Sequence, residues 1–201
     1  MPGPIKRLFK PSVKHSILAI GGLGFFLGVI FWGGFNWALE MTNNEAFCTG
    51  CHEMRDNVYQ ELKKTIHYSN RTGVRASCHD CHVPRPWIYK IIRKIEASNE
   101  LYHHLMGTVD TKEKFEAHRR ELAKHVWKVM KETDSRECRN CHNINRMNPE
   151  KQTPRARKRH QEAREQGLTC IDCHKGIAHR NVWKEMQEEK EAEEPLEGLD
   201  L

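Results

Sequence analysis

The stretch FCTGCHEM, Phe47–Met54, contains two cysteines separated by two residues and followed directly by a histidine. The same pattern occurs at three further places, and the four copies together use all eight cysteines of the chain. The pairs are Cys48 and Cys51, Cys78 and Cys81, Cys138 and Cys141, and Cys170 and Cys173, followed by His52, His82, His142 and His174. Histidine makes up 13 of 201 residues, so four such coincidences have a chance probability on the order of 10⁻⁵.

Three chemistries use closely spaced cysteines. A disulfide or a thioredoxin-like redox pair needs no histidine after it. A structural zinc site needs two pairs, or one pair and two histidines, around one ion. Covalent haem attachment needs C-x-x-C-H itself, with two thioether bonds to the porphyrin and an imidazole that reaches the iron. The sequence therefore predicts four covalently bound c-type haems, with zinc as the main alternative.

The composition is that of a chain with a thin protein core. Only 38% of the residues are apolar, and many of these lie near the N-terminus. Four porphyrins would supply apolar interior surface. The net charge of +6 is uneven, because residues 184–201 contain eight acidic side chains and two lysines, which leaves about +12 elsewhere. Haem propionates, and not nucleic acid, are the partners that we expect for this basic excess.

Residues 17–39, ILAIGGLGFFLGVIFWGGFNWAL, contain one clearly polar side chain, that of Asn36. As a helix this segment spans about 34 Å, enough to cross a bilayer. The preceding residues are basic and contain no acid, so the N-terminus is expected in the cytoplasm and the rest outside. A cleaved signal peptide is the alternative, but its apolar region is normally shorter and ends at a small-residue cleavage site. Gly24 and Gly28 form a G-x-x-x-G motif that would allow a homodimer.

The chain is expected to be mainly α-helical with much irregular structure. We predict a basic cytoplasmic segment (1–16), a transmembrane anchor helix (17–39), a multihaem cytochrome c domain (40–183) and an acidic, disordered tail (184–201). The spacing of the cysteine pairs is 30 residues in the first half and 32 in the second. His67 and His160 precede the second pair of each half by similar distances, which predicts a duplicated two-haem unit.

The long insertion between the two halves, residues 84–137, reads as two helices. The first has apolar positions at helical spacing and ends near Gly107, and the second begins after Asp110 or Thr111. One face of the second helix is predicted to carry Phe115, His118, Leu122, His125 and Val129. Shorter helices are expected around residues 54–66 and 155–166.

Each motif histidine would bind its iron from one side, and a second ligand is needed on the other. The repeat favours His67 and His160 for this role. His179 follows the last motif by five residues, and His118 shares a helix face with apolar residues. His103, His104 and His125 are weaker candidates.

The first motif offers two candidate ligands, His52 and Met54, only two positions apart. Their Cα atoms can be separated by at most about 7 Å, whereas ligands on opposite faces of one haem need about 10 Å or more. Only one of them can therefore bind, and the other face stays open or takes a residue from elsewhere. This motif begins nine residues after the anchor, where a lipid-soluble molecule could enter.

Specific strings extend beyond the four motifs. The anchor and the segments CTGCHEM, HYSNRTGVRASCHDCHVP, IRKIEASNELY, GTVDTKEKFEAHR, SRECRNCHN and LTCIDCHKGIAH resemble the NapC/NirT family of membrane-anchored tetrahaem cytochromes, and its NapC branch above all. The resemblance covers nearly the whole chain except the acidic tail. It implies a haem domain in the periplasm, anchored in the bacterial inner membrane. It also implies oxidation of membrane quinol, either menaquinol or ubiquinol, and electron transfer to a periplasmic reductase, which in the NapC case is nitrate reductase with its small cytochrome subunit.

The resemblance also suggests roles for individual residues. His67, His118, His160 and His179 stand where the family keeps histidines, and Met54 stands where a methionine replaces the motif histidine as ligand of the first haem. Glu100, with Arg93 or Lys94, matches the quinol site, although relatives often have aspartate at that position. The alternatives are a passive membrane-tethered electron carrier, a gas sensor, or the same module serving a nitrite or N-oxide reductase.

Overall fold

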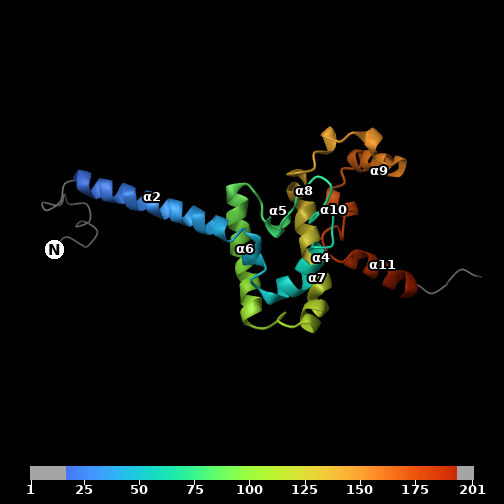
Figure 1. Cartoon of the computed structure of the whole chain (residues 1–201), viewed down its shortest axis with the longest axis horizontal. Helices are drawn as coiled ribbons and strands as arrows, with labels where there is room; N and C mark the ends of the chain where they lie inside the picture. Colours follow the sequence, from blue (N-terminus) through green and yellow to red (C-terminus); the bar gives the residue numbers. More distant parts are fainter. Residues whose placement is uncertain (1–16, 194–201) are drawn as a thin grey trace, which may run out of the picture. The chain divides into compact units, whose positions relative to one another are not determined.

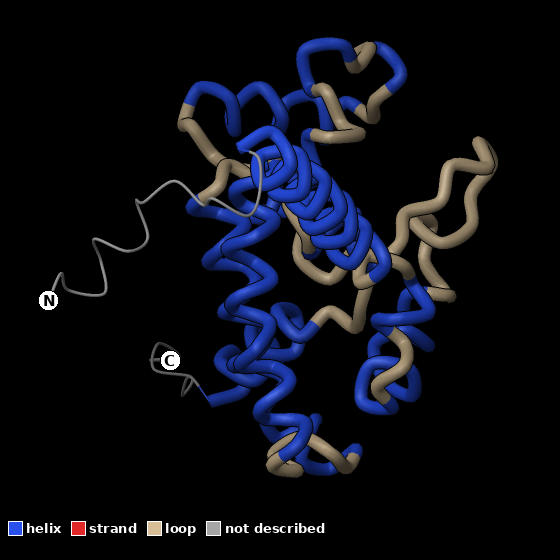
Figure 2. Tube along the Cα trace, turned by 90° about the vertical axis from the view of Figure 1, so that its left-hand side faces the viewer, coloured by secondary structure: helices blue, strands red, loops and turns tan. Residues whose placement is uncertain are grey.

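The computed structural model describes residues 17–193, and all regular structure in that range is helical (Figures 1 and 2). The chain divides into two compact units, Met1–Asn43 and Asn44–Leu201. The expectation of a mainly α-helical chain with irregular connections is therefore confirmed. The basic segment predicted for residues 1–16 lies outside the described residues.

In its described residues the first unit contains one helix, α2, Ile17–Met41, which extends two residues beyond the predicted end of the anchor. Its residues Leu18–Met41 are long and apolar enough to cross a membrane, with a mean hydropathy of 1.9. The Asn36 side-chain amide donates a hydrogen bond to the Trp32 carbonyl at 2.8 Å. Because lipid offers no hydrogen-bond partners, this bond within the helix lets a polar residue sit in an apolar span.

The second unit is built from short helical turns and two long helices. Its elements are α3 (Glu45–Cys48), the π-helix η1 (Met54–Val58), α4 (Tyr59–Leu62), α5 (Cys78–His82), α6 (Trp87–Leu105), α7 (Lys112–Glu132), α8 (Arg136–Arg139), the 3-10 helices η2 (Ile144–Arg146) and η3 (Pro149–Lys151), α9 (Pro154–Glu165), α10 (Cys170–Cys173) and α11 (Val182–Glu193). Long stretches between them are irregular (Figure 2).

The two helices predicted for the insertion are α6 and α7, the long helices of this unit in Figure 1. Helix α6 ends two residues before Gly107, whose φ of +64° lies in the left-handed region that glycine adopts without strain. Helix α7 begins after Thr111, whose hydroxyl accepts a hydrogen bond from the Lys114 amide at 3.3 Å. Both boundaries lie where the sequence signals placed them.

Two predicted boundaries differ from the structure. The helix expected over residues 54–66 begins as a π-helix and ends at Leu62. The tail predicted to be disordered from residue 184 is helical as far as Glu193, because α11 continues through the acidic run with Lys184 and Glu188 paired one turn apart. Residues 194–201 lie outside the described part of the chain.

The protein core is thin, as the composition predicts. Among the described residues, the buried apolar side chains are those of Leu62, Phe115, Ile171 and Val182. The apolar face predicted for α7 is only partly correct, since Phe115 is buried but Leu122 and Val129 are 44% and 40% exposed. One turn after Phe115, the buried position belongs to Arg119, which sequence periodicity assigned to the polar side.

Arg119 is the centre of an ionic network that joins three segments. Its guanidinium donates two hydrogen bonds to the Glu61 carboxylate, at 3.0 and 2.8 Å, and one to Glu116 at 3.0 Å. Arg180 adds its backbone amide to Glu61 at 2.9 Å and its side chain to Glu116 at 2.7 Å. Burial alone would raise the pKa of Glu61, but these donors hold it below the usual range. The network fixes α4, α7 and the segment before α11 together.

Replacing Arg119 tests this network. Arg119→Ala should lower the free energy of unfolding by about 2 kcal/mol, because it leaves the half-buried Glu61 carboxylate without its main partner. Chemical denaturation of the haem-loaded protein, followed by far-ultraviolet circular dichroism, measures the change. The neighbouring Arg120 is half-exposed and pairs with the exposed Glu189, so Arg120→Ala should change stability by less than about 1 kcal/mol. Equal losses in the two variants would contradict the assigned role.

Candidate functional site

A short helical turn carries both cysteines of the second and fourth motifs, and the first cysteine of the first and third motifs. In the second and fourth motifs the turn begins with a capping box, in which a hydroxyl residue and an acidic residue three positions later satisfy each other's backbone amides. Ser77 pairs with Asp80 in this way, and Thr169 pairs with Asp172. The box fixes the start of the turn, so the cysteines and the following histidine are presented together. Its recurrence agrees with the predicted duplication, which otherwise remains a prediction.

All eight cysteines are free thiols in the structure. The Cys48 and Cys78 thiols form a hydrogen bond, and this contact lowers the pKa of Cys48. Burial, followed by the nearby Cys138 and Cys141, raises the pKa of Cys81 to about 11. Burial, followed by the charge of the nearby Cys170, raises the pKa of Cys138. The four attachment points are therefore linked as successive neighbours in the order of the sequence.

Three motif histidines each face a second imidazole. The ring centroids are 6.3 Å apart for His82 and His179, 6.2 Å for His142 and His67, and 6.0 Å for His174 and His160. Two imidazoles that bind one metal from opposite sides, at about 2 Å per metal–nitrogen bond, hold their ring centres about 6 Å apart. The structure thus brings together three of the four distal histidines that the sequence singled out, each at the spacing of an axial ligand pair.

The outer nitrogens of two of these distal rings are held by hydrogen bonds. Nδ1 of His179 lies 3.2 Å from the Val58 carbonyl, and Nδ1 of His160 lies 2.8 Å from Oε1 of Gln152. A metal-binding histidine commonly donates its second N–H in this way, which orients the other nitrogen toward the metal. Nδ1 of His67 is buried and has no hydrogen-bond partner.

Burial keeps several of these imidazoles neutral. It lowers the pKa of His82 to about 4, assisted by nearby His179 and Arg93. It also lowers the pKa values of His174 and His179. A neutral imidazole has a free lone pair at neutral pH, which is the form that binds iron.

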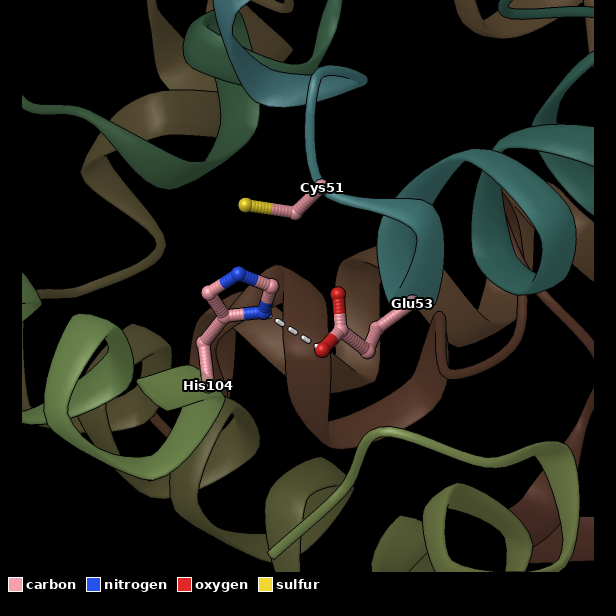
Figure 3. A group of neighbouring side chains, drawn as sticks. All are labelled: Cys51, Glu53 and His104. Carbon is pink, nitrogen blue, oxygen red and sulfur yellow. Dashed lines mark hydrogen bonds and ion pairs between the residues drawn. The ribbon is translucent and has the colours of Figure 1, made fainter. Parts of the chain in front are cut away.

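The first motif has a different environment (Figure 3). The His52 ring lies 6.0 Å from the His104 ring, but Oε1 of Glu53 contacts both. This oxygen is 2.6 Å from Nδ1 of His104 and 3.7 Å from Nε2 of His52. The Glu53 side chain is only 2% exposed, and its other oxygen is buried without a partner. The Glu53 carboxylate therefore lies within reach of both rings. In the described chain, no carboxylate contacts both rings of any of the other three pairs.

Met54, the alternative ligand of the first motif, lines an apolar cavity. The cavity is shared with Cys48 of its own motif and with Cys78, His82 and His179 of the second ligand pair. Met54 is 38% exposed. The structure therefore separates the environments of His52 and Met54, as the distance argument requires.

His118 is not brought to a motif histidine. Its Nδ1 lies 2.9 Å from the Lys114 carbonyl, one turn earlier in α7. In the part of the chain that the structure describes, no ring contact joins it to another imidazole. Its predicted role as a distal ligand thus has no geometric support comparable to that of His67, His160 and His179.

The residues predicted for the quinol site lie on α6. Arg93 and Glu100 form an ion pair, and Nε of Arg93 donates to the His82 carbonyl at 3.3 Å. Lys94 is close enough to Cys48 to lower its pKa. One turn after Glu100, His104 reaches Glu53 of the first motif. One face of α6 therefore touches both the first and the second motif.

From the sequence, His104 was only a weaker candidate ligand, and Glu53 was not predicted to belong to the site. Arg93, Glu100 and His104 are spaced by seven and four residues, which places them on one helix face. This spacing was visible in the sequence. Nothing local predicted that Glu53, an acidic residue beside a motif histidine, would be buried.

The donor set fits haem. Four cysteine pairs with adjacent histidines, three of them facing a second imidazole at the right spacing, together with a membrane-length helix, define a membrane-anchored multihaem c-type cytochrome of electron transport. The model of the NapC/NirT cytochrome c family, N-terminal region, matches residues 10–184. The chain belongs to this family.

Curated proteins that are similar over most of the chain support this family membership. The chain is 58% identical over 177 residues to the denitrification system component NirT of Stutzerimonas stutzeri, which covers 88% of both chains. It is 53% identical over 182 residues to the cytochrome c-type protein NapC of Escherichia coli, covering 89% of this chain and 91% of that one. It is 47% identical over 174 residues to a putative tetraheme cytochrome c of Allochromatium vinosum, covering 87% and 94%. No solved structure matches the chain.

The capping box of the fourth motif gives a pH-dependent prediction. The Lys131 ammonium and the Thr169 amide lower the pKa of Asp172 to about 2 from an ordinary value of 3.8. A pKa that falls on folding contributes stability above the ordinary value, and this contribution is lost as the pH falls through the folded value. Asp172→Asn should therefore cost about 1 kcal/mol at pH 6 and progressively less as the pH approaches 2, measured by denaturant unfolding.

Asp134→Asn is the matched control. The Asp134 carboxylate is 68% exposed and pairs with Arg139, so its replacement should change stability by no more than about 0.5 kcal/mol. A loss in Asp172→Asn that did not depend on pH would contradict the capping role.

Proposed function

We propose that this protein is a quinol dehydrogenase of the inner membrane, with its haem domain in the periplasm. It oxidises membrane quinol and passes the electrons singly to a periplasmic reductase, of which nitrate reductase with its small cytochrome subunit is the first candidate. The family membership, the anchor helix and the site on α6 support this proposal.

The ring spacings support an assignment of the residues that would hold four haems. The eight motif cysteines would supply the covalent attachment. His82 with His179, His142 with His67, and His174 with His160 would be the axial ligand pairs, and either Met54 or His52 would ligate the first haem. When bound, the haems supply one-electron redox chemistry and low-spin iron where two imidazoles are present.

The observation that carries the quinol assignment is the arrangement on α6. The Arg93–Glu100 ion pair lies on the helix face that contacts the first and second motifs. A quinol that loses two electrons also releases two protons. The Glu100 carboxylate is 62% exposed, so it can accept a proton and return it to water. The Arg93 guanidinium, beside it, stabilises negative charge on the quinol oxygen as the proton leaves.

The relatives and the charge of the chain support the choice of partner. The body outside the acidic tail carries an excess of basic side chains, which favours docking to an acidic redox protein. The NapC relatives support nitrate reductase. The similarity to NirT, a denitrification component, favours a nitrite or N-oxide reductase as the second candidate.

Removing a distal imidazole tests the ligand pairs. His179→Ala or His160→Ala should convert one low-spin haem per chain to a high-spin form, because one axial position loses its ligand. Low-temperature electron paramagnetic resonance of the purified haem-loaded protein measures this change. His118→Ala is the control and should leave the low-spin signals as they are. A new high-spin signal in His118→Ala, with none in His179→Ala, would reverse the assignment.

Replacing the proposed base tests quinol oxidation. Glu100→Gln should slow reduction of the protein by a quinol about 100-fold, since general-base assistance is lost, while reduction by dithionite is unchanged. Stopped-flow absorbance of the haems measures both rates. Glu96→Gln, an exposed carboxylate on the same helix, is the matched control and should reduce at the normal rate. If Glu100→Gln reacted with quinol like the unaltered protein, the passive electron carrier would be the better description.

A further inference from the structure

Helix α6 presents apolar side chains to the outside of its unit. Ile88 is 56% exposed, Ile95 is 68% exposed and Tyr102 is 56% exposed. Ile92, at the edge of the same strip, is 46% exposed. We call these four residues the outer face of α6. A water-exposed helix normally turns such residues inward, so this arrangement needs an explanation.

The outer face points away from the candidate site. At 100° per residue, Ile88, Ile95 and Tyr102 lie at about 180–220° around the helix from Arg93. Glu100 and His104 lie within about 20° of Arg93. Because Arg93 and His104 contact the motifs, and Glu100 pairs with Arg93 on the same side of the helix, the face that would approach the cofactors is the inner one. The exposure of the outer face is therefore not a consequence of its facing the haem attachment sites.

Within the second unit, α5 connects α6 to α3, the first helix of that unit. Only three residues separate the end of α2 at Met41 from the start of α3 at Glu45, a reach of about 14 Å at most. Helix α3 contacts α5, and α5 leads into α6 through residues 83–86. On α3 itself, Phe47 is a further exposed apolar side chain, at 59%.

We propose that the outer face of α6 binds the lipid surface of the membrane that α2 spans. Interfacial helices bury an apolar face to a depth of about 5–10 Å at the boundary between headgroups and acyl chains. The tyrosine at position 102 suits that boundary, since its ring is apolar and its hydroxyl polar.

This contact has a consequence for the site, although it does not rest on the quinol reaction. With the outer face in the lipid boundary, the opposite face of the same helix holds Arg93 and Glu100 at the membrane surface and turned toward the motifs. A hydrophobic reductant leaving the bilayer would then need to pass only around the helix. The lipid contact can hold even if the electron donor is another protein, so the two proposals can fail separately.

Photo-crosslinking of the full haem-loaded chain tests the contact. Benzoyl-phenylalanine is placed at Ile95 and the protein is reconstituted in nanodiscs of neutral and anionic phospholipid. Illumination should give lipid adducts, detected by mass spectrometry, at least about five-fold above the matched control with the same residue at Lys158, which is 79% exposed on α9. Adducts at the control level, or a crosslink to a second copy of the chain, would overturn the proposal.

The unaltered protein provides a second test that needs no substitution. Hydroxyl-radical footprinting in the same nanodiscs should modify Tyr102 about five-fold less than Tyr89. Tyr89 is a matched control, because it lies on the same helix, is 49% exposed, and is turned about 140° from Tyr102. Equal modification of the two tyrosines would show that the outer face meets water, and the proposal would be wrong.

Discussion

The spacing between paired imidazoles is the constraint on which the second unit depends. A spacing of about 6 Å between two rings requires further contacts that hold each ring, because a surface histidine rotates freely about its side-chain bonds. The structure fixes two of the distal rings through the nitrogen that would not bind metal, using the Val58 carbonyl and the Gln152 side chain. The irregular segments therefore hold imidazoles in position. They contribute few side chains to the apolar core.

The pairs also tie distant parts of the chain together. His67 precedes the second motif but faces the histidine of the third, and His179 follows the fourth motif but faces that of the second. The two halves therefore interlock. The ionic network strengthens this arrangement, since Glu61 binds both Arg119 of α7 and the backbone of Arg180, the residue next to His179. A disturbance of this network should reach the second ligand pair through one peptide bond.

Sequence alone identified the anchor, the four motifs and the boundaries of α6 and α7, because each depends on local spacing or on a cap such as Thr111. It also singled out His67, His160 and His179. It could not assign partners, since no local pattern indicates that His67 faces the histidine of the third motif. His118 shows that a favourable position on a helix face is not enough to predict a ligand, because its ring does not lie against a motif histidine. The burial of Arg119 and Glu53 depends on segments far away in sequence, which no periodicity reports.

The first motif differs from the other three in a way that suits a point of entry for electrons. His52 and His104 have the ring spacing of the other pairs, but the Glu53 carboxylate lies within reach of both rings, so ring spacing alone does not assign the second ligand that the first haem would take. The same helix that carries His104 carries the Arg93–Glu100 pair and, on its far side, the exposed isoleucines. The proposed membrane contact and the proposed proton acceptor therefore lie on the same helix as His104. Cysteines of successive motifs are neighbours in the order of the sequence, so the proposed entry of electrons at the first motif is compatible with a continuous row of attachment points.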